Sequence, residues 1–212
     1  MITYYARRAA EYERVYGSPR WQEDLAQIRE RIRAIFAGRR VFEVACGTGY
    51  WTRYAAERAL AVHATDVNDD TLALARAKRY ASAVSFERRD AYLPATGPAR
   101  YAGGLAALWL SHVDLARLDA FLRAFHSHLD PGAVVFMFDE RVAADRERRA
   151  PTSRTDEAGN RYEMRRLESG AEFEIVKNAF DHASLQRAIG PSATRLAYRE
   201  LGYFWTLDYV VA

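Results

Sequence analysis

The stretch from residue 41 to residue 52 carries the residues best suited to bind a ligand. It reads Val41-Phe-Glu-Val-Ala-Cys-Gly-Thr-Gly-Tyr-Trp-Thr52, and the pattern predicts a strand, a turn containing Gly47 and Gly49, and a helix. Because glycine lacks a Cβ atom, the backbone can bend sharply there, and a ligand can lie against it near the amides that begin the helix. The stretch indicates a ligand site at the carboxyl ends of strands, a feature that dinucleotide-binding and nucleoside-binding families share.

Two carboxylates indicate a ligand that contains a ribose and an adenine. Asp66 ends the second predicted strand, where a doubly wound fold places an acid that accepts both hydroxyls of a ribose. Asp90 ends the third predicted strand, where a carboxylate can accept from the exocyclic amine of adenine while the Ala91 amide reaches a ring nitrogen. The three strand ends together predict an adenosine site.

These residues resemble the class I S-adenosylmethionine-dependent methyltransferases over about residues 40 to 140. The shared features are the loop from Glu43 to Gly49, Asp66, the Asp90-Ala91 pair and the segment from Trp109 to Val113. The opening Tyr4-Tyr-Ala-Arg-Arg-Ala9 is similar to the N-terminal cap of small-molecule members.

The resemblance implies S-adenosyl-L-methionine as the cofactor and S-adenosyl-L-homocysteine as its product. It places the methionine portion on the glycine loop, the ribose on Asp66, one adenine face on Val67 and the adenine edge on Asp90 and Ala91. One departure is Ala45, which stands where the family usually has its first glycine. The cofactor-binding residues that we expect on this basis are Tyr5, Glu43, Ala45, Cys46, Gly47, Gly49, Trp51, Asp66, Val67, Asp90, Ala91, Tyr92 and Trp109.

In the reaction that the resemblance implies, an acceptor attacks the sulfonium methyl group in line, so the enzyme has mainly to align the reactants and exclude water. A hydroxyl acceptor also needs a base, whereas a thiolate or a neutral amine does not. His112 follows the fourth predicted strand and is the candidate catalytic base; the alternative is a histidine that hydrogen-bonds its own loop. The candidates for the acceptor side are Tyr4, Arg8, Tyr12 and His112, and Arg8 could meet an acidic group of the substrate.

A small molecule is the predicted acceptor. Enzymes that methylate exocyclic amines of nucleic-acid bases carry an Asp/Asn-Pro-Pro-aromatic loop after the fourth strand, and this chain has Leu110-Ser-His-Val113 there. Cytosine-C5 enzymes need a nucleophilic cysteine outside the cofactor loop, and the single Cys46 lies within that loop. The sequence predicts no metal site, because His126 and His128 point away from each other on a helix.

Two other functions stay open at this point. An NAD(P)-dependent oxidoreductase could use the same glycine turn and Asp66, but Thr52 stands where its third glycine belongs, and the chain has no catalytic Tyr-x-x-x-Lys motif. The other alternative is a non-catalytic Rossmann-like binding module. The intact set of cofactor-binding residues argues against that alternative.

The apolar pattern predicts the elements that position these residues. From residue 40 onward, short apolar strands alternate with helices, which is typical of right-handed βαβ units. Strands are predicted at 41–45, 61–65, 84–88, 103–109 and 133–138, and helices at about 4–16, 18–38, 50–60, 69–80 and 114–129. A polar stretch at 141–160, interpreted as a loop or frayed helix, precedes a hairpin at 162–167 and 172–176, a helix at 182–189, and closing strands at 194–200 and 203–211.

The predicted fold is a Rossmann-like, doubly wound α/β sheet of seven strands, mostly parallel with an antiparallel last strand, plus an N-terminal helical cap and an extra β-hairpin. A chain of 212 residues, 50% hydrophobic and 28% charged, has the size of one domain. We expect a single methyltransferase domain over residues 1–212, with the cap at 1–38, the cofactor-binding core at 39–140, and the loop, hairpin and closing strands at 141–212.

Charge and hydropathy indicate whether the protein binds nucleic acid or a membrane. Lys and Arg number 31 against 28 Asp and Glu, and no stretch forms the block of one sign that binds a phosphate backbone. The apolar runs are far shorter than the ~20 residues that span a bilayer, and acids in the first residues argue against a targeting peptide. We therefore expect a cytoplasmic monomer or homodimer that binds neither nucleic acid nor membrane.

Overall fold

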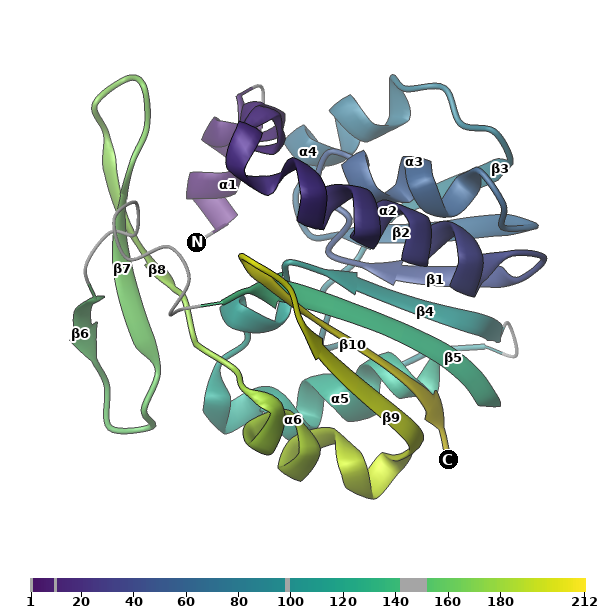
Figure 1. Ribbon diagram of the computed structural model, residues 1–212. Helices are drawn as coiled ribbons and strands as arrows, with labels where there is room; N and C mark the ends of the chain where they lie inside the picture. The colour runs from purple at the N-terminus through teal and green to yellow at the C-terminus, as the bar shows by residue number, and fades with distance from the viewer. Residues whose placement is uncertain (1, 10, 98–99, 142–151) are drawn as a thin grey trace.

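A seven-stranded sheet forms the centre of the molecule (Figure 1). The computed structural model describes residues 2–9, 11–97, 100–141 and 152–212. The strand order is β3-β2-β1-β4-β5-β10-β9, and only β10 is antiparallel to its neighbours, which confirms the predicted doubly wound sheet with an antiparallel last strand. The strands are β1 (Arg40–Val44), β2 (Ala61–Asp66), β3 (Ala83–Arg88), β4 (Tyr101–Ala107), β5 (Leu129–Glu140), β9 (Ala193–Glu200) and β10 (Phe204–Val211).

The strand order reverses at β1, which fixes where a ligand can bind. Glu43 of β1 pairs with Ala64 of β2 on one side and with Leu105 of β4 on the other. The connections that follow β1 and β4 leave in opposite directions, so a crevice opens at the carboxyl ends of these two strands. The glycine turn and the segment after β4 therefore face each other across this crevice.

Helices cover both faces of the sheet. Figure 1 shows α2 (Gln22–Phe36) and α3 (Tyr50–Ala56) on one face and α5 (Leu118–Ser127) and α6 (His182–Ile189) on the other. Because side chains alternate along a strand, Val41 of β1 packs in the core under α2 and α3, while Phe42 packs in the core under α5. The helix α4 (Asp69–Arg76) follows β2.

The N-terminal cap is not the single helix that the sequence predicted for residues 4–16. It consists of α1 (Ile2–Arg8), a 3₁₀ turn at Tyr12–Gly17 and a second 3₁₀ turn at Pro19–Trp21 that leads into α2. The two parts pack on different supports, which explains the break: Tyr4 is buried against the strands after residue 160, whereas Tyr16 stacks on Tyr50 and hydrogen-bonds the Trp51 indole.

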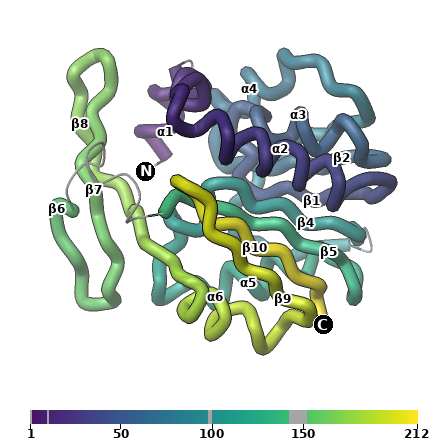
Figure 2. The backbone as a smooth tube through the Cα atoms, viewed as in Figure 1, coloured from purple at the N-terminus to yellow at the C-terminus, as the bar shows by residue number. Residues whose placement is uncertain are grey.

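The predicted hairpin belongs to a three-stranded antiparallel sheet that stands apart from the main sheet (Figure 2). Its strands are β6 (Thr152–Thr155), β7 (Arg161–Arg166) and β8 (Glu172–Val176). The prediction of a loop or frayed helix at 141–160 is thus wrong for residues 152–155, because the turn at Asp156–Asn160 folds β6 back onto β7. Residues 142–151 lie outside the described residues.

Two negative findings apply to the described part of the chain. No helix there is long and apolar enough to cross a membrane. Among the same residues, no three His, Cys, Asp or Glu side chains gather into a group that could hold a metal ion.

Candidate active site

A cavity of about 260 Å³ lies at the carboxyl ends of β1, β2, β3 and β4. Gly47, Asp66 and Asp90, from three neighbouring strand ends, all line it. The structure therefore brings the three predicted adenosine contacts to one place. The other sequence-predicted residues that line the same cavity are Tyr5, Tyr12, Glu43, Ala45, Cys46, Trp51, Val67, Ala91, Tyr92, Trp109 and His112.

The glycine loop is shaped for close approach of a ligand at Gly47. Its φ is +57°, and a Cβ atom at this position would meet nothing within 4 Å, so the backbone is open toward the cavity. Gly49 lies outside the lining: its φ is +77°, and a side chain there would collide with the Tyr80 hydroxyl. Ala45 also has a positive φ of +52°, which costs an L-residue ~1–2 kcal/mol and explains why glycine suits this position.

Asp66 is held firmly at the end of β2. Its Oδ2 accepts from the Gly47 amide at 2.9 Å, and its Oδ1 accepts from the Asn68 amide at 2.9 Å. Burial raises the pKa of this carboxyl above its ordinary value, while these hydrogen bonds act in the opposite direction. The carboxylate thus ties the second strand end to the glycine loop and also faces the cavity.

Glu43 is the most unusual group in the cavity wall. Its side chain is 1% exposed, and neither carboxylate oxygen has a hydrogen-bond partner among the described residues. Burial raises its pKa to about 8, although the nearby Thr52 hydroxyl, which does not meet hydrogen-bond geometry, acts in the opposite direction. A buried carboxylate without a partner is costly, so this group suits a ligand that brings a positive charge or hydrogen-bond donors.

Asp90 and the aromatic residues complete the cavity. Asp90 Oδ1 accepts from the Tyr92 amide at 2.9 Å, which fixes the turn after β3. Tyr5, Tyr12 and Tyr16 of the cap line the cavity together with Trp51 and Trp109. These rings form a largely apolar cover that can exclude water.

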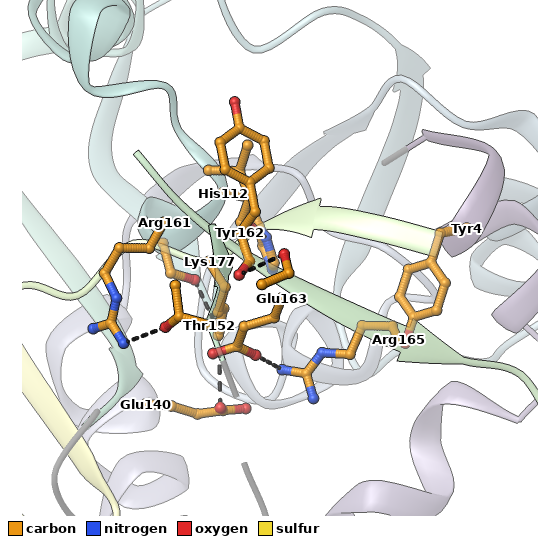
Figure 3. Close-up of polar contacts among 12 residues, drawn as sticks. Tyr4, His112, Glu140, Thr152, Arg161, Tyr162, Glu163, Arg165 and Lys177 are labelled. Carbon is orange, nitrogen blue, oxygen red and sulfur yellow. Dashed lines mark hydrogen bonds and ion pairs between the residues drawn. The ribbon is translucent and has the colours of Figure 1, made fainter. Parts of the chain in front are cut away.

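A second cavity, of about 160 Å³, adjoins the first. Tyr5, Tyr12 and His112 are among the residues that line both cavities, so the two spaces meet beside these side chains. The charged groups that line only the second cavity are Arg8, Glu140, Arg141, Arg165 and Lys177. Figure 3 shows Glu163 between Glu140 and Arg165, with a dashed line to Arg165.

The cations of the second cavity differ in their partners. Lys177 is 4% exposed and pairs with Asp139 at 3.0 Å, and Arg165 pairs with Glu163 at 2.6 Å. Arg141 pairs with Glu200. Half-buried Arg8 donates to the Tyr4 hydroxyl at 2.8 Å and lies over the Tyr12 ring, and in the described residues no carboxylate is within ion-pair distance of it.

His112 lies in the short 3₁₀ turn Leu110–His112 after β4 and is 8% exposed. Its Nδ1 is 2.7 Å from the Val176 carbonyl oxygen, and its Nε2 is 2.8 Å from the Tyr5 hydroxyl oxygen. Burial, followed by the positive charge of Lys177, lowers its pKa to about 3. The imidazole is therefore neutral at ordinary pH.

Comparison with known proteins agrees with this geometry. The sequence model of the methyltransferase domain matches residues 41–132, the segment that builds the adenosine side of the cavity. The solved structure of a DhpI–SAH complex has a TM-score of 0.80 at 27% identity, covering 100% of this chain and 95% of that one. A DhpI–SAM–HEP complex has a TM-score of 0.79 at 29% identity, covering 98% of this chain and 94% of that one.

The matched domain and the two DhpI complexes support a class I S-adenosylmethionine-dependent methyltransferase. The fold alone is shared with CalS10 bound to SAM, an amino pentose methyltransferase from Micromonospora echinaspora, with a TM-score of 0.62 at 20% identity over 95% of this chain and 96% of that one. Comparison with curated protein sequences found no match.

The residues of this methyltransferase fit its cofactor. The unpartnered Glu43 carboxylate suits the ammonium group of the methionine portion, and the open face of Gly47 leaves room beside the loop. Asp66 and Asp90 present carboxylate oxygens from neighbouring strand ends. The wall of the cavity thus offers groups complementary to each part of S-adenosylmethionine.

One residue expected on the acceptor side of the methyltransferase lies elsewhere. Tyr4 is 1% exposed and packs with Leu167 and Ile175, so it joins the cap to the three-stranded sheet and lines neither cavity. Arg8 lines only the second cavity, and Tyr12 lines both.

Sequence reasoning missed several residues that line the cavities of the methyltransferase. Lys177 and Arg165 come from the three-stranded sheet and the segment after it, where no motif marks them. The rarity of lysine was the one available signal, because Lys78 and Lys177 are the only lysines in the sequence. The other missed residues include Tyr16, Thr48, Tyr50, Asn68, Thr71, Leu108, Arg117, Glu140 and Arg141.

Proposed function

We propose that this methyltransferase transfers the methyl group, by in-line displacement, to a small molecule that carries an acidic group. The observation that carries the proposal is Arg8, whose guanidinium lines the second cavity without a carboxylate partner among the described residues. Lys177, Arg165 and Arg141 of that cavity already pair with acids, so an anionic group of the acceptor would balance the charge of Arg8.

For the cofactor we propose contacts from the first cavity. Glu43 would pair with the ammonium group, the loop of Ala45, Cys46 and Gly47 would hold the methionine portion, and Asp66 would accept from the ribose hydroxyls. The adenine would lie against Val67, with its edge at Asp90 and the Ala91 amide. When bound, the cofactor supplies a methyl group on a positively charged sulfur.

The protein would contribute mainly alignment and exclusion of water. Tyr5, Tyr12 and Tyr16 cover the cofactor cavity from the cap, and Tyr5 and Tyr12 also line the acceptor cavity, so the cap contributes to both walls at once. Alignment of this kind can account for up to ~7–11 kcal/mol of barrier reduction in ideal intramolecular cases. Strong acid or base catalysis by a side chain is then not required.

For His112 we propose a positioning role toward Tyr5 in place of the base expected from the sequence. Its Nε2 is already occupied by the Tyr5 hydroxyl, and its Nδ1 by the Val176 carbonyl. The lowered pKa of about 3 makes the imidazolium form unfavourable. A base needs a pKa near the working pH to be efficient.

The proposal is tested by incubating the enzyme with methyl-labelled S-adenosylmethionine and a metabolite extract, and fractionating the products by charge. We expect the label in small acidic compounds, and a fall of about 10–100-fold in this transfer for Arg8→Gln with little change in S-adenosylhomocysteine affinity. Arg7→Gln is the matched control, because Arg7 lies over Phe173, lines neither cavity and should behave as wild type. Label only in neutral compounds or macromolecules, or an unaffected Arg8→Gln variant, would contradict the proposal.

A further inference from the structure

The tautomer of His112 follows from its two neighbours. A carbonyl oxygen only accepts hydrogen bonds, so the 2.7 Å contact with Val176 requires Nδ1 of His112 to carry the hydrogen. In the neutral ring Nε2 is then the acceptor, and the Tyr5 hydroxyl must donate to it across 2.8 Å. The proton of Tyr5 is thus committed to His112.

Because the Tyr5 hydroxyl donates its hydrogen to His112, its oxygen can only accept hydrogen bonds from a bound acceptor. Tyr5 and His112 line both cavities, so the pair stands between the space assigned to the cofactor and the space assigned to the acceptor. With its proton turned to His112, the oxygen offers only lone pairs to the acceptor. Lone pairs attract a group that carries N–H or O–H and repel an anionic oxygen.

The surroundings of His112 favour an amine over a hydroxyl group as the atom that is methylated. A hydroxyl nucleophile would have to lose its proton to a base, but Nε2 of His112 is occupied, and burial and Lys177 oppose a positive charge on the ring. A neutral amine attacks with its own lone pair and needs no base. The carboxylate of Glu140, which also lines the acceptor cavity, lies 3.8 Å from the Lys177 ammonium and is thus engaged in an ion pair.

We propose that the methylated atom is an amine nitrogen held by the Tyr5 oxygen, so that the substrate is a small molecule with an amine at Tyr5 and an acidic group toward Arg8. This rests on the proposed function. The ammonium form first loses its proton to water, so that the neutral amine binds. The nitrogen lone pair then forms the N–C bond while the S–C bond breaks and its electron pair returns to sulfur. The methylated ammonium product afterwards loses a proton to water.

Product chemistry tests the atom that is methylated. We expect the labelled product from the metabolite extract to withstand mild base and to be retained on a cation exchanger at low pH, as an N-methylated amine is. Release of labelled methanol in base identifies a methyl ester, and a base-stable product without a basic nitrogen identifies an ether or thioether; either overturns the inference while leaving the acidic acceptor intact. Absence of any labelled small molecule counts against the proposed function itself.

Nitrogen-15 NMR of the histidine rings tests the geometry without an acceptor. In the enzyme saturated with S-adenosylhomocysteine, we expect His112, identified by its loss in His112→Asn, to show the neutral Nδ1–H form at pH 7. A hydrogen on Nε2, or a protonated ring at that pH, would overturn the inference.

Variants of the pair separate positioning from a structural role. Tyr5→Phe should lower turnover by about 100-fold with less than about a threefold change in S-adenosylhomocysteine affinity, because it removes the oxygen that holds the amine. Since His112 acts through Tyr5, adding His112→Asn to Tyr5→Phe should cause little further loss. Independent, multiplying losses in the double variant would show that His112 does not act through Tyr5.

Discussion

The hydroxyl oxygen of Tyr5 lies 2.8 Å from Nε2 of His112, although 107 residues separate the two in the chain. Tyr5 belongs to the cap helix α1, and His112 follows strand β4 of the sheet. The contact therefore joins the cap to the turn that separates the two cavities. A cap that is displaced from the sheet would leave both the cofactor cavity and the acceptor cavity without a wall.

Glu43 should make the ligand-free enzyme less stable as the pH rises. Burial raises its pKa to about 8, whereas in the unfolded chain it titrates near its ordinary value of 4.5. Between these values the folded state holds a proton that the unfolded state has lost, so the free energy of unfolding should fall by a few kcal/mol from about pH 5 to pH 8. Urea unfolding across this range measures the slope.

The Glu43→Gln variant should lose most of that slope, because glutamine does not titrate. The variant should also bind S-adenosylhomocysteine more weakly, since a neutral amide replaces the carboxylate that we propose as the partner of the ammonium group. Glu57→Gln, at the exposed end of α3 where Glu57 pairs with Arg33, is the control and should keep the wild-type slope. An unchanged slope in Glu43→Gln would show that another group causes the pH dependence.

Asp66→Asn should weaken cofactor binding. In the wild type the two carboxylate oxygens accept from the Gly47 and Asn68 amides, and we assign their remaining acceptor capacity to the ribose hydroxyls; asparagine retains only one of these oxygens. Hydrogen bonds to a charged group contribute about 1.5–3 kcal/mol each, so a loss of about 10–100-fold in S-adenosylhomocysteine affinity is expected by calorimetry. Asp70→Asn in the first turn of α4 should bind normally; comparable weakening in both variants would remove the special role of Asp66.

Lys177→Met should destabilise the folded protein strongly. Lys177 donates to Asp139 at 3.0 Å and to Ser111 at 2.9 Å, and both charged side chains are almost fully buried. Removing the cation leaves the Asp139 carboxylate buried without its charge partner, at a cost of about 3–5 kcal/mol measured by urea unfolding. Adding Asp139→Asn, which removes the charge but keeps an oxygen for the Ser111 amide, should restore much of the stability, and a double variant no more stable than Lys177→Met would argue that the charge pair is not the cause.

The two halves of the site differ in how far the sequence predicted them. Gly47, Asp66 and Asp90 each follow a short apolar strand, and because parallel strands end at one edge of a sheet, local patterns were enough to predict that they would meet. Gly49 was predicted to bind the cofactor because it belongs to the same turn. In the structure it faces Tyr80 and lies outside the cavity wall. Tyr4 similarly packs into the contact between cap and three-stranded sheet.

The acceptor side depends on segments that the chain brings together from far apart. Arg165 and Lys177 come from β7 and the end of β8, Arg8 from α1 and His112 from the turn after β4. No local pattern specifies such a meeting, because it depends on how the cap and the three-stranded sheet pack beside the main sheet. The partners of His112 are decided there as well, since Tyr5 and Val176 are both distant from it in the sequence.

By itself, the sequence determined the doubly wound sheet and the adenosine-binding strand ends, because the alternation of apolar strands with helices and the positions of glycine and aspartate are local properties. Only the tertiary structure decided which cations face the acceptor and which nitrogen of His112 carries its hydrogen. These features are set by hydrogen bonds and burial between residues that are distant in the chain. The physical reason is that a side chain's charge and tautomer depend on the groups that surround it after packing.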